Sequence, residues 1–248
     1  MAMDTIGKSQ KKKNAVATVL MIILFTILAI LIVLPIYAIF MASFHPGNFL
    51  LQYGLNLDPD FAHMTLSNYV LLFTGDHDYW IWFGNSLILT VLTVVLTLLI
   101  SSFVAYGFAA YDFKGKNFFF VIVLIILSIP FEVIMLPLYK QISTWGLMDS
   151  YVAVMLPFLA HASTIFFFRQ YLLGLPKSLI EAGRIDGATE YGIFFKLIVP
   201  IMKPAFSAMA ILNGMNAWNN YMWPLLVIRS SSKYTLTIGL NTLINPYG

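Results

Sequence analysis

Five apolar stretches, each long enough to cross a membrane, dominate the sequence and limit what it can fold into. They run over about 15–40, 87–106, 118–139, 151–168 and 197–228, and the first two contain no charged residue. A helix needs about 20 mostly apolar residues to cross the hydrocarbon core, because each residue rises about 1.5 Å through a layer about 30 Å thick. We therefore expect an all-α, polytopic integral membrane protein with five transmembrane helices.

Composition supports this expectation and removes several classes of function. Hydrophobic residues make up 60% of the chain and charged residues 10%, whereas soluble domains have about 25% charged residues. A soluble globular protein is thus excluded. The absence of cysteine excludes disulfides, thiolate catalysis, iron–sulfur clusters and cysteine-ligated zinc. The net charge of +3 is spread over loops rather than gathered on one face, so we expect no nucleic-acid partner.

Basic residues predict the orientation, because Lys and Arg concentrate in cytoplasmic loops. A cytoplasmic N-terminus places 11 basic residues inside, Lys8, Lys11, Lys12, Lys13, Lys114, Lys116, Arg169, Lys177, Arg184, Lys196 and Lys203, and only Lys140, Arg229 and Lys233 outside. We expect one transmembrane domain over 1–248, with a cytoplasmic N-terminus at 1–14, an external loop at 41–84 and a cytoplasmic loop at 172–199. The first apolar stretch is too long for a typical signal peptide, so we expect it to stay in the membrane.

The 172–199 loop reads as two short amphipathic helices. Leu179, Ile180, Ala182 and Ile185 would share roughly one apolar face of the first helix. Gly187 is a natural helix terminator. Asp186 or Thr189 would cap the second helix, which leads into Pro200 at the start of the fifth stretch.

One motif in this loop is specific. Glu181-Ala182-Gly183 is followed by Gly187 and later by Ile198 and Pro200. This pattern resembles the EAA motif of ABC importer permeases, with Gly183 at the second Ala and Val199 at the usual Leu; Gly183 alone should loosen the helix by about 1 kcal/mol. The best fit is the second membrane subunit of sugar importers of the maltose-transporter type. The resemblance extends to 136–139, 146–151, 168–170 and 218–224.

The resemblance implies a location and a set of partners. The chain would lie in the bacterial cytoplasmic (inner) membrane as a heterodimer with a second permease subunit, served by a dimer of cytosolic ATPase subunits and an extracytoplasmic solute-binding protein. Its coupling helix would dock on an ATPase subunit through Glu181, Ala182, Gly183, Arg184, Asp186, Gly187 and Ala188. Family members typically have six spans, so we expect a sixth beyond Gly248.

The chain itself should bind no cofactor and catalyse no reaction. It contains no G-x-x-x-x-G-K-[ST] phosphate loop, the motif that cradles nucleotide phosphates in many ATPases. ATP and Mg would be bound by the partner ATPase subunits. No cluster of metal ligands accompanies the isolated histidines, so we predict no metal site.

Polar residues within the spans indicate where solute passes. Amides and aromatic rings suit carbohydrate, since hydroxyls pair with amides and sugar faces stack on rings. Glu132 either lines the route or reaches towards water at the interface, and His161 more plausibly bonds a neighbouring helix than a ligand. The fifth stretch would line a sugar path or contact the partner permease through Asn213, Asn216, Trp218, Asn219, Asn220 and Tyr221.

These observations predict a permease subunit of an ATP-driven sugar or oligosaccharide importer that works by alternating access. The same architecture importing glycerol 3-phosphate or another polar solute is an alternative, although a strongly anionic solute favours cationic pathway residues, which the spans lack. An intramembrane enzyme using Glu132 and His161 is a second alternative, from a different class.

Overall fold

The structure is a computed structural model that describes residues 2–47, 60–75 and 78–243, all without strands. It divides into two compact units, one of residues 1–77 with 246–248 and one of 78–245. The predicted external loop, 41–84, is therefore described only in part, because 48–59 and 76–77 lie outside the described residues.

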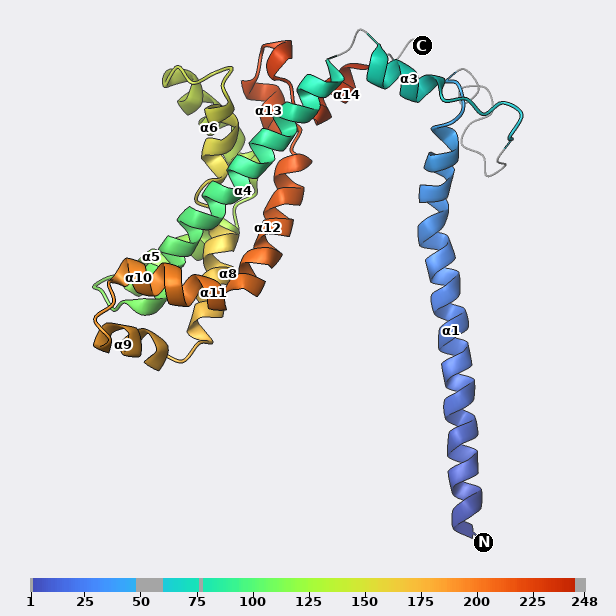
Figure 1. Ribbon diagram of the computed structural model, residues 1–248, viewed down its shortest axis with the longest axis horizontal. Helices are drawn as coiled ribbons and strands as arrows, with labels where there is room; N and C mark the ends of the chain where they lie inside the picture. Colours follow the sequence, from blue (N-terminus) through green and yellow to red (C-terminus); the bar gives the residue numbers. More distant parts are fainter. Residues whose placement is uncertain (1, 48–59, 76–77, 244–248) are drawn as a thin grey trace. The chain divides into compact units, whose positions relative to one another are not determined.

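The first unit is built on one long helix, α1 (Ala2–Ala42). Its segment Ala17–Ala42 is long and apolar enough to cross a membrane, as predicted, and its side chains from Ala17 to Ile36 are exposed. A helix so apolar on all sides requires lipid or another protein around it. A short helix, α3 (Ser67–Thr74), is joined to the end of α1 by a hydrogen bond of 2.7 Å between the hydroxyls of Tyr69 and Ser43 (Figure 1).

The second unit is organised around α4 (Tyr79–Ala110), which packs against α8 (Ala162–Leu173) and α12 (Lys203–Trp218) (Figure 1). Every fourth residue along one side of α4 is buried, and most are small or hydroxylated: Asn85, Leu89, Thr93, Thr97, Ser101 and Ala105. Small residues at this spacing let helix backbones approach closely within a membrane. One of these hydroxyls also bonds to the backbone of another segment: Thr97 Oγ1 donates a 3.0 Å hydrogen bond to the Phe158 carbonyl.

Three predicted spans are bent rather than continuous. The described part holds two helices that are long enough to span a membrane, or five spans if each bent pair counts as one. The bends are 102° between α5 (Lys116–Leu127) and α6 (Phe131–Thr144), 44° between Tyr151–Phe158 and α8, and 77° between Glu190–Ile201 and α12.

Prolines explain two of these bends. Pro130 is the N-cap of α6; it lacks an amide proton and disfavours helical backbone at the preceding residue, so the helix cannot run through from α5. Pro204 stands at the start of α12, where a missing amide proton costs nothing. The spans predicted over 118–139 and 197–228 are therefore broken at these prolines rather than continuous.

The two ends of α4 carry different short helices (Figure 1). One end holds α9 (Ser178–Ile185), α10 (Glu190–Ile193), a π-helical turn η2 (Phe194–Ile198) and α11 (Val199–Ile201). The other holds α6, α13 (Met222–Val227), η3 (Ser231–Lys233) and α14 (Leu236–Leu243). The remaining elements, α7 (Tyr151–Met155) and η1 (Leu156–Phe158), precede α8.

A buried core lies at each of these ends. Beside α9–α11 it contains Tyr106, Phe168, Phe194 and Met202. At the α13 end it includes Trp223, whose indole donates a 3.0 Å hydrogen bond to the Ala153 carbonyl. The close approach of α14 to α4 there requires Gly239, because a Cβ at that position would lie 2.0 Å from Cδ2 of Trp82.

Asp149 fastens the turn before α7 to the segment after α13. Its Oδ1 accepts from the amides of Arg229 (3.0 Å) and Ser230 (2.9 Å), and its Oδ2 accepts from the Ser230 hydroxyl (2.5 Å) and Lys233 Nζ (3.0 Å). These hydrogen bonds, those of Ser230 foremost, hold the pKa of Asp149 well below its ordinary value. Asp149 also has a positive φ of 58°, a conformation that Asp tolerates better than most residues.

We predict that Asp149→Asn lowers thermal stability at neutral pH and that the deficit shrinks in acid. A carboxylate with a depressed pKa stabilises the folded state above its unfolded pKa of about 3.9, and this contribution is lost as pH falls towards the folded pKa. Melting temperatures of detergent-purified protein should therefore differ by a constant amount from pH 8 to about 5 and converge below about pH 4.

The matched control is Asp186→Asn, at a residue that is exposed and makes no side-chain hydrogen bond within the described part. It should leave the melting temperature unchanged across this range. Equal melting temperatures for wild type and Asp149→Asn at pH 7 would contradict the role of Asp149.

Candidate functional site

The 172–199 loop forms two short helices, as predicted. Gly187, with a φ of +77°, ends α9 in the left-handed conformation that glycine adopts without strain. The amides of Gly187 and Ala188 donate to the carbonyls of Arg184 (3.1 Å) and Gly183 (3.0 Å). The Thr189 hydroxyl accepts from the Gly192 amide at 3.1 Å and so caps α10, which decides between the two predicted caps.

The face of α9 that turns inward differs from the prediction. Leu179, Ile180 and Gly183 are half-buried, whereas Ala182 is exposed and Ile185 is 85% exposed. The helix lies on Ile193 of α10, and a Cβ on Gly183 would be only 3.0 Å from Ile193 Cγ1. Gly183 thus lets α9 approach α10 closely, a benefit that the helix-propensity argument omitted.

One carboxylate connects α9, α10 and the end of α4. Arg184 donates to Glu190 through Nε at 2.6 Å and through Nη2 at 3.3 Å. The hydroxyls of Tyr111 (2.6 Å) and Tyr106 (3.3 Å) donate to the same group. We call Tyr106, Tyr111, Arg184 and Glu190 the Glu190 cluster.

Electrostatics follow from this geometry. The hydrogen bond to Glu190 raises the pKa of Arg184, so its charge is secure. Burial, followed by the bond to Glu190, raises the pKa of Tyr111. Sequence reasoning missed Tyr106, Tyr111 and Glu190, because no local pattern indicates that residues about 80 positions apart share one carboxylate.

The other predicted residues of this loop face outward. Glu181, Asp186, Gly187 and Ala188 are exposed, and within the described residues no hydrogen bond or ion pair engages the Glu181 carboxylate. Glu181 also borders a small cavity of about 180 Å³ whose other charged lining residues are Asp112, Lys177 and Arg184.

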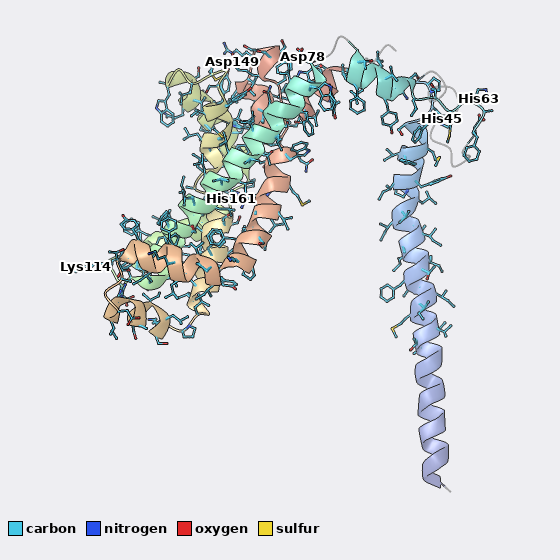
Figure 2. The ribbon with its side chains drawn as sticks, in the orientation of Figure 1. His45, His63, Asp78, Lys114, Asp149 and His161 are labelled. Atoms are coloured by element: carbon cyan, nitrogen blue, oxygen red, sulfur yellow. The ribbon has the colours of Figure 1, made fainter. Side chains whose placement is uncertain are left out.

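A second candidate region is a cavity of about 250 Å³ among α4, α12, α13 and the segment that runs from α7 to His161. Hydroxyl, amide and imidazole groups share its lining with apolar side chains, and within the described residues none of the lining residues is Asp, Glu, Lys or Arg. The lining comprises Ser86, Leu89, Thr93, Thr97, Phe131, Val154, Phe158, His161, Asn213, Asn216, Ala217, Asn220, Pro224 and Thr235. Figure 2 shows His161 between the two ends of the second unit, with Asp149 towards one end and Lys114 towards the other.

Hydrogen bonds fix part of this lining and leave part of it available. Asn213 Nδ2 donates to Thr164 Oγ1 at 3.1 Å and to the Met209 carbonyl at 2.9 Å. In the part of the chain that the structure describes, the side-chain amides of Asn216 and Asn220 make no hydrogen bond. These two amides are therefore available to form hydrogen bonds with a bound solute.

The remaining predicted pathway residues lie elsewhere. Asn219 donates to the Met215 carbonyl at 2.8 Å, and Tyr221 donates to Asn241 Oδ1 at 3.1 Å. Trp218 packs edge-on against Phe83, with ring centroids 5.7 Å apart. Glu132 is exposed in the first turn of α6 and does not line the cavity.

His161 also differs from its prediction. Its Nδ1 lies 2.7 Å from the hydroxyl of Ser163, two residues away, rather than bonding a neighbouring helix. Sequence reasoning missed Ser86, Thr93, Thr97 and Thr235 in the lining. The four-residue spacing of hydroxyls in α4 could have indicated Thr93 and Thr97, whereas no local pattern indicated Ser86 or Thr235.

Comparisons with known proteins give relatives over most of the chain. A family model described as "Binding-protein-dependent transport system inner membrane component" matches residues 98–247. The chain is 50% identical to the arabinooligosaccharides transport system permease protein AraQ of Halalkalibacterium halodurans, over 96% of this chain and 86% of that protein. It is 51% identical to AraQ of Bacillus subtilis, over 90% and 80%.

A more distant relative and a solved structure also match most of the chain. The chain is 31% identical to the sn-glycerol-3-phosphate transport system permease protein UgpE of Brucella suis, over 90% of this chain and 80% of that protein. Among solved structures it is similar to a bacterial ABC transporter involved in the import of the acidic polysaccharide alginate. That match has a TM-score of 0.82 and 25% identity over 95% of this chain and 82% of that one.

We predict that Thr164→Val destabilises the protein, because it leaves the buried Asn213 amide without a partner on α8. Thr164 is fully buried, and an unsatisfied buried polar group costs about 1–3 kcal/mol. The matched control is Thr90→Val on α4, since Thr90 Oγ1 is buried without a partner within the described residues. Thermal unfolding in detergent should show a loss for the first variant and none for the second; an equal loss in both would contradict the role of the Thr164–Asn213 pair.

Proposed function

Since the chain belongs to the family of binding-protein-dependent transport system inner membrane components, we propose that it is a permease subunit of an ATP-driven importer of a sugar or oligosaccharide. The observation that carries the proposal is the uncharged, hydroxyl- and amide-lined cavity between α4 and α12. The relatives at 50% and 51% identity are arabinooligosaccharide permease proteins, which supports this class of solute. Both units of the chain would form one permease domain.

The chemistry of the cavity favours a neutral solute. Sugar hydroxyls donate to and accept from amides and hydroxyls alike, and Asn216 and Asn220 present amides that no described residue engages. A phosphate group is bound best by Arg or Lys, and neither residue type is among those that line the cavity. Glycerol 3-phosphate is therefore the weaker candidate, although UgpE proteins are relatives.

An intramembrane enzyme has less support. His161 lines the cavity, but Glu132 is exposed in α6 and is not among the lining residues. A catalytic acid and base must both reach one substrate. The chain itself would therefore catalyse no reaction, and ATP and Mg would be bound by the ATPase subunits of the complex.

The α9 end of the second unit is proposed to face the cytoplasm, in keeping with a cytoplasmic N-terminus. Glu181, Ala182, Asp186, Gly187 and Ala188 are exposed there and would contact an ATPase subunit, while Gly183 packs inward on α10. When the two ATPase subunits close on ATP, the movement of α9 would carry the adjoining helices as a rigid body. The cavity would then open alternately to an extracytoplasmic binding protein and to the cytoplasm, at the interface with a second permease subunit.

We predict that Glu181→Lys reduces co-purification of the ATPase subunits by more than about tenfold, because reversing an interface charge costs several kcal/mol. The second permease subunit should be retained. Glu132→Lys, at an exposed acid outside the 172–199 loop, is the matched control and should retain both partners. Mass spectrometry of affinity-purified membrane complexes gives the measurement, and absence of any ATPase with the wild type would overturn the importer proposal.

Solute identity is tested by uptake in proteoliposomes that contain the complete complex. We expect uptake of labelled arabinotriose, with Asn216→Leu or Asn220→Leu lowering the rate by about tenfold through loss of a hydrogen bond in the cavity. Asn219→Leu changes an amide that bonds to the backbone outside the cavity and should have no effect. Uptake of labelled glycerol 3-phosphate in place of arabinotriose would contradict the sugar assignment.

A further inference from the structure

The Glu190 cluster lies where three segments meet. Arg184 belongs to α9, Glu190 begins α10, Tyr106 belongs to the last turns of α4, and Tyr111 directly follows that helix. Figure 1 shows α9 and α10 together at this end of α4. A single carboxylate therefore joins the 172–199 loop to the central helix of the unit.

The hydrogen bonds in this cluster are charge-assisted, because Glu190 accepts them as a carboxylate. Arg184 approaches Glu190 through two nitrogens, at 2.6 and 3.3 Å, and Tyr111 donates at 2.6 Å. Hydrogen bonds to an ionised group are about twice as strong as neutral ones, and a two-nitrogen approach also fixes orientation. The Arg184 guanidinium lies 5.5 Å from the centre of the Tyr111 ring, within the range of a cation–π contact.

The cluster rests on a rigid base. Tyr106 is 4% exposed, and its ring centroid lies 5.2 Å from that of the buried Phe194. Its ring also meets Tyr111 edge-on at 5.8 Å. Tyr106 is therefore held in the core, and Tyr111, which is 36% exposed, contacts it from the surface.

Without this cluster, α9 has few polar attachments. Among the described residues, the bonds from Arg184 to Glu190 are the only side-chain hydrogen bonds that leave α9. At its C-terminal end, α9 is followed by Gly187, whose φ is +77°. The other contacts of α9 with the unit are apolar, through Ile180 and Gly183, and apolar contacts do not fix direction.

Arg184 has a second acidic neighbour with which it forms no ion pair in the structure. Glu181 precedes it by three residues on α9, a spacing at which helical side chains pair. Arg184 instead bonds Glu190, and Glu181 stays exposed. The two residues therefore differ in role, because Arg184 bonds to Glu190 within the chain and the Glu181 carboxylate has no hydrogen-bond partner among the described residues.

We propose that Glu190 is a positioning residue that clamps α9 to the end of α4, so that α9, α10 and α4 move as one body during transport. The inference rests on the proposed function, since it concerns how force applied to α9 reaches the helices around the cavity. It assigns Arg184 to this clamp rather than to the surface that meets the ATPase.

The direct test measures the position of α9 relative to α4 in the purified complex. The chain has no cysteine, so Lys177→Cys next to α9 and Lys114→Cys after α4 give two unique spin-label sites in it. Electron–electron distance measurements should give one narrow distribution in the otherwise wild-type chain. Glu190→Gln and Tyr111→Phe should each broaden it, and Tyr191→Phe, at an exposed neighbour, should not.

The functional test compares solute transported with ATP hydrolysed, using arabinotriose in proteoliposomes. We expect Glu190→Gln to lower this ratio by about 2- to 30-fold, the range found when residues of a coupling network are changed, while ATP hydrolysis continues. Arg184→Gln should lower it similarly. The double variant should be no worse than either single one, because both remove the same bond.

The outcomes separate the two proposals. A wild-type complex that neither contains an ATPase nor transports solute overturns the proposed function. A wild type that transports, together with a Glu190→Gln variant whose distance distribution and transport ratio are unchanged, overturns the clamp alone. If Glu190→Gln fails to assemble, Tyr111→Phe, which keeps the charge pair and removes one hydroxyl, decides in the same way.

Discussion

Close packing along α4 is the constraint on which the rest of the second unit depends. Lipid is as apolar as the helix surfaces, so burial of apolar area does not drive helices together in a membrane; contact between backbones does. The buried row from Asn85 to Ala105 offers small and hydroxylated side chains at every fourth position, and α8 and α12 lie against α4. Thr93 and Thr97 of this row also line the cavity, so these two residues contribute to both packing and polarity.

Much of this architecture could be predicted because it depends on local chemistry. Long apolar runs and the motif around Glu181 are visible in the sequence without any knowledge of tertiary contacts. The bends between α5 and α6 and before α12 could not be predicted in angle, because a proline indicates that a helix breaks but its new direction is set by packing. Likewise, Asn213, Asn216 and Asn220 line the cavity while Asn219 does not, a distinction that depends on how α12 is rotated.

The 172–199 loop shows the same division at the level of single residues. The motif predicts which residues of the loop contact a partner but not which way each side chain turns. Gly183 costs helix stability considered alone, yet Ile193 occupies the space that a Cβ would take. In the sequence, Arg184 looks like one more charged surface residue; only the structure shows that it bonds to Glu190, which also accepts a hydrogen bond from Tyr111. Such roles arise from contacts over long sequence separations, which no single-sequence pattern encodes.

The cavity and the Glu190 cluster have no residue in common. Substitutions of Thr93, Asn216 or Asn220 alter what the cavity can hold and leave the clamp intact. Under the proposed function, the solute that such a permease carries could change through a few hydroxyl and amide side chains while the Glu190 cluster stays the same. The relatives named for arabinooligosaccharides and for glycerol 3-phosphate differ in solute, as this separation would permit.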